Sequence, residues 1–184
     1  MPSGQLRNKA CSDRLLSPGR LLLIFLICSL AGCHSSPADE FSIYLLQDQL
    51  SGVDVLGQDL SDLPRQEQPV LTSRDIVRYN PSRHEIELTG DAYRRIQLLF
   101  STPIKTDGIP FVVTVGETPI YAGAFWTPLS SLSYNGIVIM QPMEPDSNLI
   151  RIELGYPGPD FFSGADLRAD PRILDALQRS GKIN

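Results

Sequence analysis

The sequence predicts an α+β fold: a mainly antiparallel sheet with one packed central helix and a second helix at the C-terminus. Short β-branched and aromatic runs, separated by turn residues, predict strands that follow one another closely. Two other segments place apolar residues at helical spacing behind a capping residue. Because helices interrupt the succession of strands only twice, the order does not match the regular alternation of a parallel α/β fold.

The first strands lie on either side of a long polar loop. Residues 41–46 are aromatic and β-branched and predict the first strand. Residues 47–70 are acidic and predict a loop, with a short strand or turn near Leu60–Leu63. Thr72 or Ser73 can cap a single helical turn. His84–Leu88 then alternates between apolar and charged residues, which predicts a strand with its glutamates directed outward.

The remaining elements begin with the central helix. Thr89 is a good N-cap for a helix whose apolar residues begin at Ala92, and Pro103 lies beyond its end. Four further strands are predicted over 109–115, 118–122, 136–140 and 148–154, the first two joined as a hairpin by Gly116-Glu117. Asp170 and Pro171 open the terminal helix as cap and first residue, and Gly181 ends it.

The N-terminal segment has the layout of an export signal. The first twenty residues carry four basic residues and one acid, and ten apolar residues follow at Leu21–Leu30. Ten helical residues span roughly 15 Å, about half of a bilayer core, so a permanent transmembrane helix is the weaker alternative. The run ends in Leu30-Ala31-Gly32-Cys33, which resembles the lipobox of bacterial lipoproteins.

This resemblance implies cleavage after Gly32 and a diacylglycerol thioether on Cys33. Residues 1–32 are then a signal peptide, 33–40 a lipid-anchored tether and 41–184 a single domain. Each buried methylene contributes about 0.8 kcal/mol, so two or three acyl chains hold firmly. We therefore expect a protein anchored on the extracytoplasmic face of the cell membrane. An ordinary secretory signal, cut at a small residue such as Ala31, is the alternative.

Composition narrows the classes of partner. Residues 33–184 carry 12 Lys and Arg against 20 Asp and Glu, a net charge of −8. A net acidic chain without a basic stripe argues against nucleic acid, and membrane contact is expected through the lipid alone. Cys11 and Cys28 fall in the signal peptide, so the domain is expected to contain no thiol or disulfide.

No motif indicates catalysis, a cofactor or a metal. His34 and His84 lack the spacing of metal ligands. Ser133-Tyr134-Asn135 is similar to an element of penicillin-recognising enzymes, but the required Ser-x-x-Lys is missing. We therefore expect a non-enzymatic binding domain. A carboxylate-dependent hydrolase remains an alternative, and it requires two acids at one cleft with one raised pKa.

Aromatic residues are the candidate contacts for a ligand or partner. They gather in two stretches, at Tyr121, Phe125, Trp126 and Tyr134 and at Phe161 and Phe162. Because an alternating strand buries only half of its side chains, some should lie on the surface and contact an envelope protein or a cell-wall glycan. Packing in the core is the alternative. On the first hypothesis, Trp126→Ala weakens capture of the partner and leaves thermal melting nearly unchanged.

Residues 70–141 carry a further resemblance. The likeness consists of Leu71-Thr72-Ser73-x-Asp75-Ile76, Ile86-x-Leu88-Thr89, the pair of strands around Ile109–Ile120, and Asn135-Gly136-Ile137. These segments resemble the head of the periplasmic P1 region of SecD, an accessory subunit of protein export. The resemblance implies a fold and, as an alternative function, an accessory role in export or envelope assembly. The segment Tyr121–Tyr134 departs from the SecD pattern.

Overall fold

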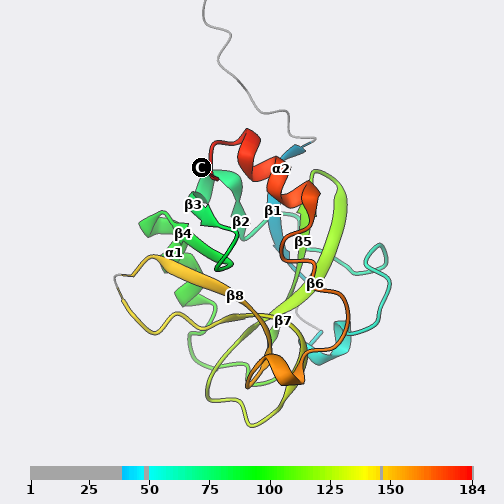
Figure 1. Cartoon of the computed structure of the whole chain (residues 1–184). Coiled ribbons are helices and arrows are strands. Elements are labelled where there is room, and N and C mark those ends of the chain that lie inside the picture. The colour runs from blue at the N-terminus through cyan, green and yellow to red at the C-terminus, as the bar shows by residue number, and fades with distance from the viewer. Residues whose placement is uncertain (1–38, 48–49, 146, 184) are drawn as a thin grey trace, which may run out of the picture. The chain divides into compact units, whose positions relative to one another are not determined.

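The computed structural model describes residues 39–47, 50–145 and 147–183, which form an α+β domain with one curled, eight-stranded sheet (Figure 1). The strands are β1 Phe41–Leu45, β2 Leu71–Thr72, β3 Ile76–Asn80, β4 Glu85–Leu88, β5 Ile109–Val115, β6 Thr118–Trp126, β7 Tyr134–Met140 and β8 Leu149–Tyr156. The helices are α1 Gly90–Leu98 and α2 Pro171–Arg179. The predicted class, α+β with a mainly antiparallel sheet, is confirmed.

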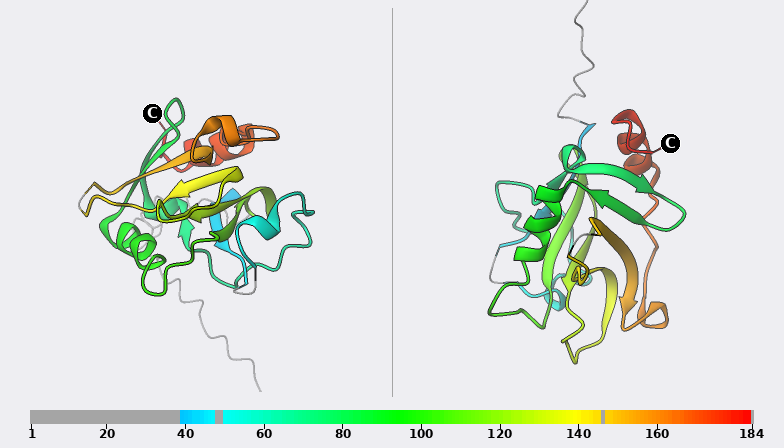
Figure 2. Two further views of the ribbon diagram at one scale, coloured as in Figure 1. Left: turned by 90° about the horizontal axis from the view of Figure 1, so that it is seen from below. Right: turned by 90° about the vertical axis from the view of Figure 1, so that its left-hand side faces the viewer.

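The sheet runs in the order β2-β1-β5-β6-β7-β8-β4-β3 and curls into a half-barrel (Figure 2). Neighbouring strands are antiparallel except β6 and β7, which are parallel. After Trp126 the chain runs back to the level of Gly123, which pairs with Ile137, and then continues in the same direction as β6. The main core fills the inner face of the sheet, and both helices contribute to it. Helix α1 supplies Ala92, Tyr93 and Ile96, and helix α2 supplies Ile173, Ala176 and Leu177.

Strands β5, β6 and β7 are covered on both faces. Phe111 and Phe125 enter the main core on the inner face. On the outer face, Val112 packs against the segment that carries Val55 and Leu63. Farther along, Trp126 packs against Tyr134 and Val138 on the same outer side. The centre of the sheet is therefore closed to solvent, whereas the outer face of β8, β4 and β3 carries charged, exposed side chains.

The predicted local signals are confirmed. The Thr89 hydroxyl accepts the Ala92 N–H at 3.3 Å, and the Asp170 carboxylate accepts the Arg172 N–H at 2.9 Å. Thr72 caps a 3₁₀ turn over Ser73–Asp75, as expected. Gly181 follows α2 with a φ of 69°, a conformation that glycine adopts without strain.

The sequence analysis missed one strand and ended another too early. The sequence interpretation placed no strand at 76–80, where β3 forms an antiparallel hairpin with β4. It also ended the returning strand of the hairpin at Ala122, whereas β6 continues to Trp126. β3 pairs with β4 across the short turn at residues 81–84, and β6 continues where it pairs in parallel with β7.

Candidate functional site

Four of the six aromatic candidates lie in the core, so for these four the alternative of core packing holds and the expected surface contact does not. Tyr121, Phe125, Trp126 and Tyr134 are buried. The physical reason is that β6 is a central strand with both faces covered, so that Phe125 and Trp126 are buried on opposite sides. Phe161 is 48% exposed, and Phe162 is half-buried against the main core.

Trp126 is the centre of a small aromatic cluster. Its ring stacks on Tyr134 at 4.9 Å, and Tyr156 lies 5.9 Å away at a tilt. Gly108, at a φ of 84°, lies so close that an added Cβ would stand 2.5 Å from the indole. Because this side chain is buried, the alternative of packing in the core applies to Trp126, and we now expect Trp126→Ala to lower the melting temperature.

A polar cluster lies on the inner side of the β3–β4 hairpin. The Tyr79 hydroxyl donates to the carbonyl of Arg168 at 3.2 Å and lies 3.3 Å from Nδ1 of His84. Burial raises the pKa of Tyr79 to about 12. Burial, together with the nearby Arg168 charge, lowers the pKa of His84. His84 was predicted to begin a strand; it lies instead in the turn before that strand, partly buried, at a φ of 51°.

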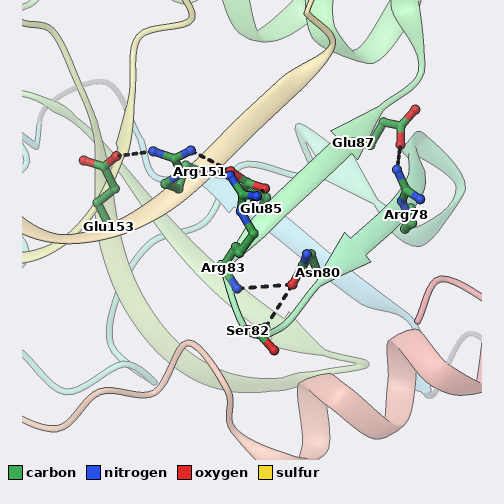
Figure 3. Close-up of polar contacts among 8 residues, drawn as sticks. All are labelled: Arg78, Asn80, Ser82, Arg83, Glu85, Glu87, Arg151 and Glu153. Atoms are coloured by element: carbon green, nitrogen blue, oxygen red, sulfur yellow. Dashed lines mark hydrogen bonds and ion pairs between the residues drawn. The ribbon is translucent and has the colours of Figure 1, made fainter. Parts of the chain in front are cut away.

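The outer face of β8, β4 and β3 carries a network of arginines and glutamates (Figure 3). Glu85 of β4 accepts from Arg151 of β8 at 2.6 Å and pairs with Arg83 at 3.0 Å. Arg78 of β3 donates to Glu87 of β4 at 3.0 Å. We call the set Arg78, Arg83, Glu85, Glu87, Arg151 and Glu153 the charged face.

A groove of about 550 Å³ follows the β3–β4 hairpin across this charged face. Its lining includes the charged residues Arg78, Arg83, Glu85 and Glu87 and the apolar Leu149. The β3–β4 turn beside it is ordered by Asn80, whose side-chain oxygen accepts the N–H groups of Ser82 and Arg83 (Figure 3). Such a groove offers charged hydrogen-bonding groups with a small apolar margin, which suits a polar protein surface.

Sequence reasoning missed this face because it missed β3. A signal was present, since Ile76-Val77-Arg78-Tyr79 is β-branched and aromatic and a Pro81-Ser82 turn precedes the next strand. The outward direction of Glu85 and Glu87 was predicted, but their arginine partners come from β3 and β8.

The carboxylates with shifted pKa values all shift downward. Hydrogen bonds from arginine lower the pKa of Glu85, Asp166 and Asp170. Hydrogen bonds from Ser51 and Ser61 lower the pKa of Asp54 and Asp59. Their ionised forms are therefore stabilised, which is the opposite of what a carboxylic acid needs in order to donate a proton.

The remaining expectations concern metal ligands, membrane-spanning helices and the N-terminal segment. Among residues 39–47, 50–145 and 147–183, no three His, Cys, Asp or Glu side chains are grouped for a metal ion. In that same part of the chain, no helix has the length and apolar character needed to cross a membrane. The predicted signal peptide 1–32, His34 and the predicted lipidation residue Cys33 lie outside the described residues.

Comparison with protein-family models, with curated proteins and with solved structures gives no match to this chain.

Proposed function

We propose that this protein is an envelope lipoprotein, anchored through Cys33 on the extracytoplasmic side of the membrane, whose domain binds another protein and performs no catalysis. The observation that carries the proposal is Leu30-Ala31-Gly32-Cys33 at the end of a short apolar run. As a helix that run would span only about half of a bilayer core, so we expect acyl chains on Cys33 to supply the membrane attachment.

A protein partner is favoured over a glycan by the chemistry of the exposed groups. Four of the aromatic side chains that would stack on a sugar are buried. The charged face instead offers guanidinium and carboxylate groups beside a groove. Arginine is enriched at protein interfaces because its planar group makes several hydrogen bonds at once.

The anchor is tested by the intact mass of the protein purified from membranes. The expected mass is that of residues 33–184 plus a diacylglycerol, with or without a further acyl chain. Cys33→Ser is the control, because an oxygen in place of sulfur removes the thiol that forms the thioether. An unmodified N-terminus, or a chain that still begins at Met1, would disprove the anchor.

The alternative role in export or assembly predicts a different set of neighbours. Cross-linking in intact envelopes, followed by purification of this protein, would recover translocon subunits if that role is correct. The same experiment with Arg151→Glu tests the charged face, since a partner held there should be lost with the charge reversal. A partner recovered equally with both proteins binds elsewhere on the domain.

A further inference from the structure

The two methionines of the domain lie at one cavity. The chain has three methionines, and Met1 falls in the predicted signal peptide. The other two, Met140 and Met143, line the same cavity of about 270 Å³, between the end of β7 and the start of β8. Met143 is 70% exposed, and Met140 is partly buried beside the Trp126 cluster. A thioether side chain with so much exposed surface contributes little to the core, which leaves its polarizable sulfur available to a ligand.

Hydrogen bonds hold the backbone of Met140–Glu144 in place at both ends. The Gln141 N–H donates to the carbonyl of Trp126 at 2.7 Å. At the other end, the carbonyl of Glu144 accepts the hydroxyl of Tyr93, a buried residue of α1. Three residues of chain span at most about 10–11 Å, and a methionine side chain has three rotatable bonds. Both sulfur atoms can therefore reach one ion in the cavity between them.

The groups around the cavity select a soft cation. The described residues that line it include no histidine or cysteine, the ligands that Zn²⁺ prefers. They include two carboxylates, Glu85 and Glu144, and Glu85 is already paired with Arg151. Ca²⁺ takes roughly six to eight oxygen ligands, which this lining does not supply. Thioether sulfur is a soft ligand that favours Cu(I), and two glutamates against one arginine do not repel a cation.

We propose that Met140 and Met143 together bind a soft monovalent metal ion, Cu(I), through their two thioether sulfurs. Cu(I) accepts low coordination numbers, so two ligands on a fixed stretch of backbone are sufficient for reversible binding. Neutral thioethers hold the ion more weakly than thiolates do, so this site would release Cu(I) to a stronger acceptor. The site goes beyond the proposed binding of a protein, and its chemistry does not depend on the lipid anchor.

The test follows the two methionine side chains directly by NMR. Full-length protein with isotope-labelled methionine methyl groups is purified from membranes in a non-ionic detergent, and silver nitrate is added in a chloride-free buffer. Ag(I) has the soft character of Cu(I) and is stable in air. We expect the methyl signals of Met140 and Met143 to shift together and to saturate at one Ag(I) per chain. Zn²⁺ and Mg²⁺ should leave both signals in place.

Substitutions identify the ligands. Met140→Leu and Met143→Leu each remove a sulfur and nearly conserve volume, and Met143 is exposed, so its replacement leaves the fold intact. Each should weaken Ag(I) binding at the remaining methionine by about tenfold or more, since even a change beside a metal ligand typically costs about that much. Leu149→Ala is the matched control, because Leu149 lines the same cavity, is half exposed and has no sulfur. It should leave the affinity nearly unchanged.

The opposite results would overturn the site in recognisable ways. Methyl signals that shift at different Ag(I) concentrations, or a Met143→Leu protein that binds as tightly as the parent, would exclude a shared site. Equal shifts with Zn²⁺ would show that donors other than sulfur hold the ion. A shift that begins only after a first equivalent of Ag(I) is consumed would reveal a free thiol at Cys33, which contradicts the lipid anchor and supports the methionine site.

Discussion

At the residue scale, Trp126 shows how the environment of a strand decides the role of an aromatic side chain. The indole has no exposed surface, stacks on Tyr134 and leaves no room for a Cβ at Gly108. Because neighbouring atoms enclose the indole, this side chain contributes to the stability of the fold. Its removal leaves a cavity that the surrounding strands can fill only in part.

We therefore expect Trp126→Ala to lower the free energy of unfolding by about 3–5 kcal/mol. Urea titration followed by circular dichroism would measure the change. Phe161→Ala is the control, because that ring is 48% exposed and its loss should have a much smaller effect. Equal midpoints for the two variants would contradict the placement of Trp126 in the core.

His84 should make stability depend on pH. Its pKa in the folded protein is below the ordinary value of 6.5, because of burial first and Arg168 second. The unfolded chain therefore binds a proton at a higher pH than the folded protein does. The stability that the neutral ring contributes is present above about pH 6.5 and is lost as the pH falls below it.

The variant His84→Asn tests this dependence, because asparagine tolerates the positive φ of 51° and does not titrate. Urea midpoints between pH 7 and pH 5 should fall for the parent and change less for His84→Asn. Glu85, Asp166 and Asp170 have lowered pKa values, so their contribution is lost at lower pH in both proteins. Parallel curves between pH 7 and 5 would show that His84 is not responsible.

At the element scale, the features that the sequence predicts well are local ones. The caps of α1 and α2 and the turn between β5 and β6 depend on residues within a few positions of each other. The order of strands in the sheet is not local: β4 pairs with β8 across more than sixty residues of sequence, as Glu85 and Arg151 show. No single-sequence pattern encodes that pairing.

In the candidate site, too, the local features could be predicted and the long-range contacts could not. The glutamates of β4 could be assigned to the outer face from their alternation, but the arginines beside them could not, because they arrive from β3 and β8. The aromatic candidates on β6 were misplaced for a related reason. Alternation predicts which side of a strand a residue occupies, but not whether another segment covers that side.

The contribution of the N-cap of α2 to the stability of the domain can be measured with a single substitution. Asp170 accepts the N–H of Arg172 at 2.9 Å and also pairs with the Arg172 guanidinium at 2.7 Å. We expect Asp170→Ala to lower stability by about 1 kcal/mol, the usual value of a lost N-cap. Asp175→Ala, an exposed change within the same helix, should alter it by less than about 0.5 kcal/mol. Similar midpoints would mean that α2 does not depend on this cap.

At the scale of the whole molecule, the proposed anchor and the charged face would together determine how strongly the domain holds a protein partner. Exposed ion pairs contribute only about 0.2–1 kcal/mol each, so the charged face alone should bind a partner weakly. Confinement of both proteins to one membrane would raise the effective concentration of the partner, to the order of millimolar for short flexible links. The lipid would thus contribute to binding without touching the interface.

This balance predicts that capture of the partner depends on the membrane. The fraction of this protein that is cross-linked to its partner should be highest in native membranes and should decline when the membranes are dissolved in a non-ionic detergent and diluted tenfold, because dilution removes the confinement. Higher salt should lower the yield further, since screening acts on exposed charges. Measuring cross-linked fraction against dilution at two salt concentrations separates the two effects. A yield independent of dilution would show that the interface is strong by itself, and that charged side chains and a narrow apolar margin do not describe it fully.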